Sequence, residues 1–136
     1  MRIVFDSNIL ISALTLPGGQ GDRALATVLA GDATLILCKP VLGEVLRILG
    51  TKFSRDAEEL SRVAVLLGDL AEWVEPRLKV SVLKDDPDNR VLECALAAKV
   101  TLIVTGDRAM LDLGSFEGIE ITSLRTFLER MSNNRK

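Results

Sequence analysis

The stretch MRIVFDSNIL, residues 1–10, decides how the rest of this sequence is interpreted. Arg2 to Phe5 has the apolar character of a short buried strand, and it runs directly into Asp6, Ser7 and Asn8. An aspartate at this point is a favoured N-cap for a following helix. It is equally well placed to be one corner of a metal site, because ligands bind at the carboxyl ends of parallel strands. The surrounding sequence has to separate these two interpretations.

Composition limits the chemistry that is available to the chain. The 136 residues are 48% hydrophobic, which predicts one folded domain with a substantial core. No apolar run approaches the roughly 20 residues of a membrane-spanning helix, and Asp6 interrupts the first apolar stretch, so we expect a cytoplasmic protein without a signal peptide. Cys38 and Cys94 lie in apolar segments and are expected to be reduced core residues. The absence of histidine removes Ser-His and Cys-His nucleophile systems and most zinc sites, which leaves carboxylates.

The apolar runs alternate with helical patterns along the chain. This alternation predicts a single α/β domain with a central, mainly parallel sheet of four or five strands and helices on both faces. The domain is expected to span residues 1–131, with a polar tail at 132–136, and a loop is expected at 14–21. Further strands are predicted at 34–38, 73–75, 101–105 and 119–121, and helices at 22–30, 40–50, 55–71, 88–99 and 124–131.

Several carboxylates follow the predicted strands. Asp6, Glu44 and Asp107 lie just beyond strand ends, and Asp88 joins them if its helix begins at the same edge of the sheet. Each acid alone is explained as a helix cap or a first-turn acid. Four acids on one edge would repel one another unless a cation lay between them, and oxygen ligands favour Mg²⁺ or Mn²⁺.

The helix that follows "DDP" indicates which of its acids points inward. Asp88 falls in line with the apolar stripe of that helix, so we expect it to be the inner ligand. Asp86 is expected to cap the helix, with Pro87 at its first position, and Glu93 falls outside the stripe and is expected to face mostly solvent.

The motifs together resemble the PIN domain. "VFDSNILISAL", "PGG", "ILCKPVLGEVLRIL" and "DDPDNRVLECALAAKVTLIVTGDRAML" carry the resemblance, which runs from residue 1 to about 130 and is closest to VapC-type toxins of toxin-antitoxin pairs. The resemblance implies a Mg²⁺-dependent ribonuclease for single-stranded RNA, a cognate antitoxin protein and a homodimer. It implies metal-binding, catalytic acids at Asp6, Glu44, Asp88 and Asp107, supported by Ser7, Asn8, Asp86 and Thr105. Lys39 departs from the family, which often has a small hydroxyl residue there.

RNA requires positive charge, yet the net charge of the chain is −2. Four basic residues beside the acids are candidates for a local RNA-binding rim: Lys39, Lys84, Arg90 and Arg108. Two other functions stay open. A receiver-like phosphoryl-transfer domain would normally need a lysine where "TGDRAM" has Arg108, and in a non-catalytic interaction module the acids would only cap helices. Val65 and Leu66 lie beside the inward stripe of the 55–71 helix and add to the expectation of a dimer.

Overall fold

The computed structural model describes residues 1–134; residues 135 and 136, the end of the predicted tail, lie outside the described residues. The strands are β1 (Arg2–Phe5), β2 (Thr34–Leu37), β3 (Glu72–Trp73), β4 (Leu102–Thr105), β5 (Ser115–Phe116) and β6 (Ile119–Ser123). The helices are α1 (Ser7–Thr15), α2 (Gln20–Leu29), α3 (Lys39–Lys52), α4 (Ala57–Leu70), α5 (Asp86–Ala98), α6 (Arg108–Leu113) and α7 (Leu124–Asn134).

The strands form one sheet in the order β3-β2-β1-β4-β6-β5, in which only the β5–β6 pair is antiparallel. The predicted α/β class with a mainly parallel sheet is therefore confirmed. In the described residues the sheet has six strands, one more than the upper expectation, because β5 forms a hairpin with β6. No strand was predicted at 115–116, whereas β3, equally short, overlaps the strand predicted at 73–75.

The first strand occupies the middle of the sheet, between β2 and β4. Ile3, Val4 and Phe5 are each at most 1% exposed, so both faces of β1 are covered. The ring of Phe5 meets that of Phe127 on α7 edge-to-face, with centroids 5.7 Å apart. An uninterrupted apolar run is what a strand buried on both faces requires, which is why this segment lies at the centre.

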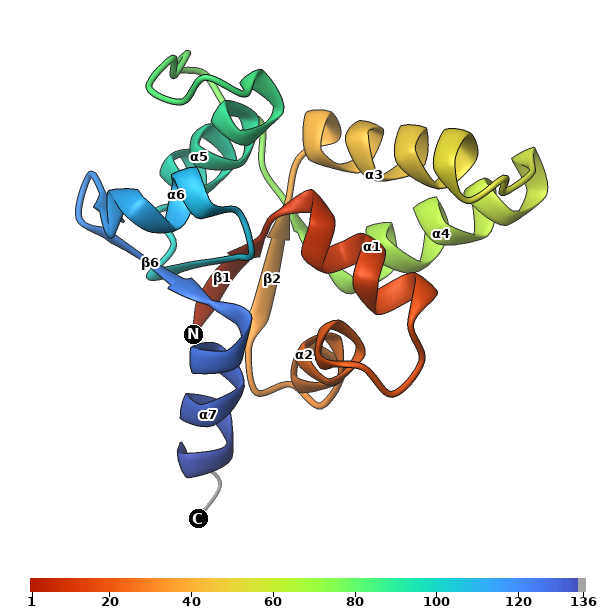
Figure 1. Ribbon diagram of the computed structural model, residues 1–136, viewed down its shortest axis with the longest axis horizontal. Helices are drawn as coiled ribbons and strands as arrows, with labels where there is room; N and C mark the ends of the chain where they lie inside the picture. Colours follow the sequence, from red (N-terminus) through yellow and green to blue (C-terminus); the bar gives the residue numbers. More distant parts are fainter. Residues whose placement is uncertain (135–136) are drawn as a thin grey trace.

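Helices cover both faces of the sheet. Right-handed crossovers from β1 to β2 and β3 put α1 to α4 on one face, and the reversal from β3 to β4 puts α5 on the other. The packing agrees, because α2 lies against α1 and α7, whereas α5 lies against β1 and β2. Figure 1 shows β1 and β2 at the centre, with α3 and α4 on one side and α5 and α6 on the other.

Several element boundaries differ from those predicted. Helix α1 follows Asp6 directly and α2 begins at Gln20, so the loop between them is shorter than residues 14–21. Gly50 does not end α3, which continues to Lys52. A Cβ at Gly50 would lie 3.4 Å from the side chain of Leu60, an ordinary contact distance, so α4 packs against α3 at this point without requiring a glycine.

The end of the chain is also more regular than expected, because α7 extends through Ser132 to Asn134. Cys38 and Cys94 are buried and unbridged, in agreement with the sequence. Over residues 1–134, no helix is both long enough and apolar enough to cross a membrane.

Candidate active site at the carboxyl edge of the sheet

The carboxyl ends of β1 and β4 and the first turns of α3 and α5 meet at one edge of the sheet. A pocket of about 300 Å³ opens there, which we call the acid pocket. Three of the four predicted ligands line it, and the fourth, Asp107, contacts Asp88. Its lining residues are Asp6, Ser7, Asn8, Glu44, Arg47, Ile48, Lys52, Asp85, Pro87 and Asp88.

Asp6 caps a helix and also lines the acid pocket. Its Oδ1 accepts a hydrogen bond from the backbone N–H of Ile9 (2.9 Å), so it is the N-cap of α1. Its Oδ2 accepts a hydrogen bond from the hydroxyl of Thr105. The side chain is only 2% exposed, and this burial raises its pKa despite both hydrogen bonds. A surface cap would not need to be buried, so capping alone does not account for this position.

Thr105, the last residue of β4, links two of the acids. Its hydroxyl donates to Asp6, and the same oxygen accepts from the backbone N–H of Asp107 at 3.0 Å. Asp107 in turn caps α6 through the N–H of Met110 at 2.9 Å. The fully buried threonine therefore holds the end of β1 and the start of α6 in a fixed relation.

Asp88 lies among the other acids of the pocket. Burial raises the pKa of its carboxyl to about 7, together with the charges of Asp107, Asp85 and Asp6 and a hydrogen bond with Asp107. Glu44, by contrast, has a local partner, because it forms an ion pair with Arg47 at 2.6 Å. The two sides of the pocket thus differ in charge balance. The aspartates repel one another, whereas the negative charge of Glu44 is balanced by Arg47.

The chemistry of these groups fits a hard divalent cation, because every candidate ligand is an oxygen and the aspartates repel one another. In the described residues, 1–134, no group of three or more acidic or cysteine side chains is arranged to hold a metal ion. Glu44 bonds Arg47, while both Asp6 oxygens accept hydrogen bonds. A cation would therefore have to compete with Arg47 for Glu44.

The predicted basic rim is only partly brought to this edge. Lys39 lies against a different cavity, lined also by Trp73 and Glu93. Arg90 is held internally by its own contacts, and its side chain is 20% exposed. Lys84 and Arg108 are exposed near the starts of α5 and α6, and neither lines the acid pocket.

Two basic residues that do line the pocket, Arg47 and Lys52, were not predicted. Arg47 follows Glu44 by three residues, a spacing that makes the two neighbours on α3, and this spacing is the signal that could have found Arg47. Lys52 lies five residues beyond Arg47, about 140° around the helix, so spacing does not predict its place at the pocket.

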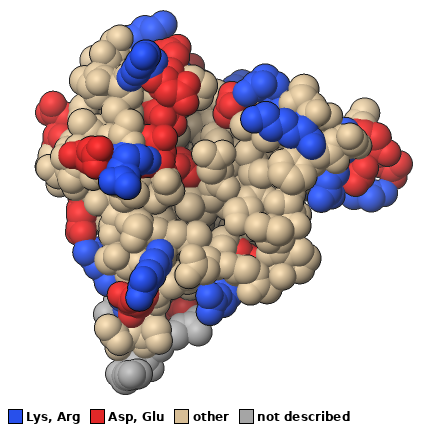
Figure 2. Space-filling view, viewed as in Figure 1, with Lys and Arg blue, Asp and Glu red and all other residues tan. Residues whose placement is uncertain are grey.

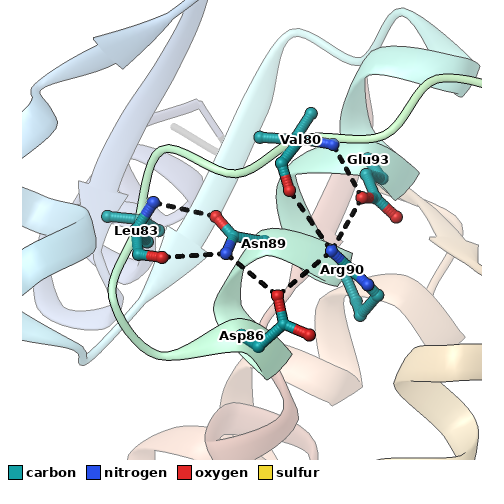
Figure 3. A network of polar contacts seen from close by, with 6 residues as sticks. All are labelled: Val80, Leu83, Asp86, Asn89, Arg90 and Glu93. Atoms are coloured by element: carbon teal, nitrogen blue, oxygen red, sulfur yellow. Dashed lines mark hydrogen bonds and ion pairs between the residues drawn. The ribbon is translucent and has the colours of Figure 1, made fainter.

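A second polar cluster lies behind the acid pocket, between α5 and residues 74–85, an irregular segment that we call the strap (Figure 3). The side-chain amide of buried Asn89 accepts a hydrogen bond from the backbone N–H of Leu83 and donates one to the carbonyl of Leu83, each at 2.9 Å. Glu93 accepts from the N–H of Val80 at 2.8 Å and pairs with Arg90 at 3.0 Å. Here the acids belong to a network that fastens the strap to α5.

The strap overturns two expectations about α5. Glu93 is 8% exposed and not turned to solvent, because the strap covers that face of the helix. The N-cap is Asp85, and Asp86 is the first helical residue. The carboxylate of Asp86, expected beside the metal ligands, accepts from Asn89 and Arg90 at 3.3 Å.

Comparison with known proteins agrees with this architecture. By fold, the chain is similar to one in the crystal structure of VapBC2 from Rickettsia felis bound to a DNA fragment from their promoter: TM-score 0.64, 15% identity, over 90% of this chain and 98% of that one. By sequence, it is 24% identical over 117 residues to the "Uncharacterized protein MJ1680" of Methanocaldococcus jannaschii, covering 83% of this chain and 75% of that protein. Residues 2–109 match the model of the PIN domain. The chain therefore belongs to the PIN domain family.

Proposed function

We propose that this protein is a Mg²⁺-dependent endoribonuclease that hydrolyses phosphodiester bonds of single-stranded RNA, with Mn²⁺ as a substitute ion. The observation that carries the proposal is the gathering of acids around Asp88 in a partly buried position, where burial and then the charges of Asp107, Asp85 and Asp6 raise the pKa of Asp88 to about 7. A protein rarely keeps such repulsion without a cation to relieve it. Membership of the PIN domain family supports a nuclease.

In this proposal Asp6, Glu44, Asp88 and Asp107 hold the cation. When bound, the ion activates water and stabilises the charge that develops on phosphate during in-line attack. Thr105 keeps Asp6 and Asp107 oriented through its hydroxyl. Ser7 and Asn8 line the pocket beside Asp6 and are assigned to support the metal-binding acids. Lys84 and Arg108 are assigned to the outer rim.

The test is cleavage of a mixed pool of RNAs with Mg²⁺ or with EDTA, comparing wild type with Asp6→Asn. Asparagine keeps the size of Asp6 and still caps α1, so the fold is retained while one metal-holding charge is lost. Asp32→Asn is the matched control, because Asp32 is exposed in the turn before β2, at the opposite edge of the sheet. The proposal is supported if wild type cleaves RNA in Mg²⁺ and if this cleavage is lost both in EDTA and in the Asp6→Asn variant. Cleavage by Asp6→Asn equal to wild type would contradict the role of Asp6, and a wild type that cleaves no RNA in Mg²⁺ would instead favour a non-catalytic interaction module.

We further propose that the protein is the toxin of a toxin-antitoxin pair and acts on cytoplasmic RNA, bound and silenced by a cognate antitoxin. The likeness in fold to a chain of the VapBC2 structure supports this role. Induced expression in bacterial cells should arrest growth for wild type and not for Asp6→Asn. Equal growth of cells that express either form at equal level would count against the toxin role.

A homodimer through α4 is part of the proposal. Val65 is 62% exposed and Leu66 is 45% exposed, side by side on α4, and such apolar surface is typically covered in an assembly. Light scattering on the purified protein should give twice the chain mass, and Val65→Glu should return it to one chain mass. A wild-type monomer at micromolar concentration would contradict the dimer.

A further inference from the structure

The acid pocket contains two cations that the metal site does not require. Arg47 and Lys52 line it together with Glu44, all from α3. Arg47 lies three residues after Glu44 and is its neighbour on the helix surface, and Lys52 lies about 7.5 Å farther along the helix axis than Arg47. Figure 2 shows basic side chains gathered over α3, across a hollow from a band of acidic ones.

Arg47 is only partly used by its ion pair. Its guanidinium contacts both carboxylate oxygens of Glu44, at 2.6 and 3.4 Å, yet 59% of the side chain stays exposed. A guanidinium has five N–H donors, so several remain directed toward solvent at the pocket. The same residue can therefore hold Glu44 and contact an anion.

Lys52 has no local partner. It is exposed, and among residues 1–134 it makes no hydrogen bond or ion pair. A lysine in the last turn of a helix stabilises the helix through the macrodipole, which explains its presence at the end of α3. The macrodipole does not explain why Lys52 also lines a pocket that contains Asp6 and Asp88.

The other basic residues near this edge are directed elsewhere. Arg90 contacts Glu93, Asp86 and the carbonyl of Val80, and Lys39 lines the separate cavity beside Trp73. Of the basic residues in the described chain, those that line the acid pocket come from α3 alone. Positive charge at the pocket therefore forms a row along one wall and not a ring.

We infer that Arg47 and Lys52 form a phosphate-binding row, which directs the backbone of single-stranded RNA along α3 as it leaves the metal site. This inference rests on the proposed nuclease function. Arg47 contacts the phosphate next to the cation, and Lys52 contacts a phosphate farther along the strand. The RNA strand thus passes along α3 from Arg47 to Lys52, whereas the rim predicted from the sequence consisted of Lys39, Lys84, Arg90 and Arg108.

The experiment measures RNA binding and cleavage for Lys52→Gln and Lys52→Glu. The matched control is Lys99→Gln, which removes one positive charge from the exposed end of α5, at the opposite edge of the sheet. Binding is measured on an Asp6→Asn background with a labelled oligouridine in Mg²⁺, by fluorescence anisotropy over a range of salt concentrations. Each lost phosphate contact reduces the slope of log affinity against log salt by about 0.7 for a single strand.

For Lys52→Gln we expect that reduced slope, an affinity about fivefold lower at 0.1 M salt, and a higher KM with unchanged kcat. Lys52→Glu should lower affinity further, and Lys99→Gln should match the parent. Arg47→Lys keeps the positive charge but loses the planar guanidinium that binds a phosphate through two N–H groups. It should therefore weaken RNA binding without changing the slope of log affinity against log salt. If wild type cleaves RNA but Lys52→Gln and Lys99→Gln both bind RNA as tightly as their parent, the phosphate-binding row is overturned and the nuclease function is not. Wild type that neither binds nor cleaves RNA overturns the nuclease function and the row with it.

Discussion

Helix α5 carries two acids in opposite circumstances. Glu93 is buried under the strap, where Arg90 and the N–H of Val80 compensate its charge. Asp88, at the start of the same helix, faces Asp107, Asp85 and Asp6, and no cation of the described chain pairs with it. A carboxylate whose charge is matched by neighbours stabilises the fold. A carboxylate whose neighbours repel it costs stability. Such a group is typical of a functional site, where a bound ligand supplies the opposite charge.

The largest expected effect comes from making the same isosteric change at both acids. Asp88→Asn should lower the rate of RNA cleavage by about a thousandfold, equivalent to about 4 kcal/mol, because it removes a charge that holds the cation. Glu93→Gln should keep the rate within about threefold and lower the free energy of unfolding instead. Single-turnover cleavage and urea unfolding on both variants provide the comparison. The contrast between the two acids would be broken if Glu93→Gln lost activity as severely as Asp88→Asn.

Replacing Arg90, which carries the positive charge in the strap network, should have the next largest effect, on the free energy of unfolding. Arg90→Met leaves Glu93 buried with only the N–H of Val80, so we expect a loss of about 2–3 kcal/mol, less than for a fully buried pair because Arg90 is 20% exposed. The double variant Arg90→Met with Glu93→Leu should recover most of this loss. Urea unfolding tests both, and a double variant no more stable than the single would show that Arg90 acts by something other than pairing.

Loss of the Asn89 amide should have a smaller effect. Asn89→Ala removes two hydrogen bonds to Leu83 and leaves its backbone groups unpaired, at a cost of about 1–2 kcal/mol. Because the strap is then held mainly by Glu93 and Arg90, limited proteolysis should cut within residues 74–85 faster than in wild type. Unchanged cleavage there would mean that the amide does not hold the strap.

The smallest effect concerns pH and metal. The folded-state pKa of Asp88, about 7, is above its ordinary value of 3.8, so the folded state binds more protons between these values. Without divalent ions, the contribution of Asp88 to stability is therefore present at pH 4 and is lost as the pH rises toward 7 and above. Asp88→Asn should flatten this part of the curve of Tm against pH. Mg²⁺ should raise the Tm of wild type at pH 8, and an equal rise in Asp88→Asn would contradict the metal assignment.

Much of the site could be predicted because its residues are adjacent in sequence to strong strand signals. Asp6 follows β1 and Asp107 follows β4 after one glycine, so a parallel sheet has to deliver both to one edge. Thr105 was predictable for the same reason, as the last residue of an apolar strand. That Asp6 is at once a helix cap and a member of the acid pocket could not be read from its position, because both roles select the same residue.

The irregular segments could not be predicted in this way. The strap has no periodicity, so nothing in the sequence indicated that it would cover α5 and bury Glu93. By contrast, the pairing of Arg90 could have been predicted, because Asp86 and Glu93 lie four residues before it and three after it on α5, where side chains are neighbours.

The sequence by itself determined the α/β class, the central place of β1 and the edge at which Asp6 and Asp107 meet. These depend on local hydrophobicity and on the direction of parallel strands, which are properties of contiguous residues. Only the tertiary structure decided which charged groups are buried and which line the site. It covered Glu93 with the strap, brought Lys39 to a cavity beside Trp73, and left Arg47 and Lys52 at the acid pocket. The physical reason is that burial and the lining of a cavity depend on segments distant in sequence, whereas the ion pairs Arg90–Glu93 and Arg47–Glu44 join residues three apart on one helix.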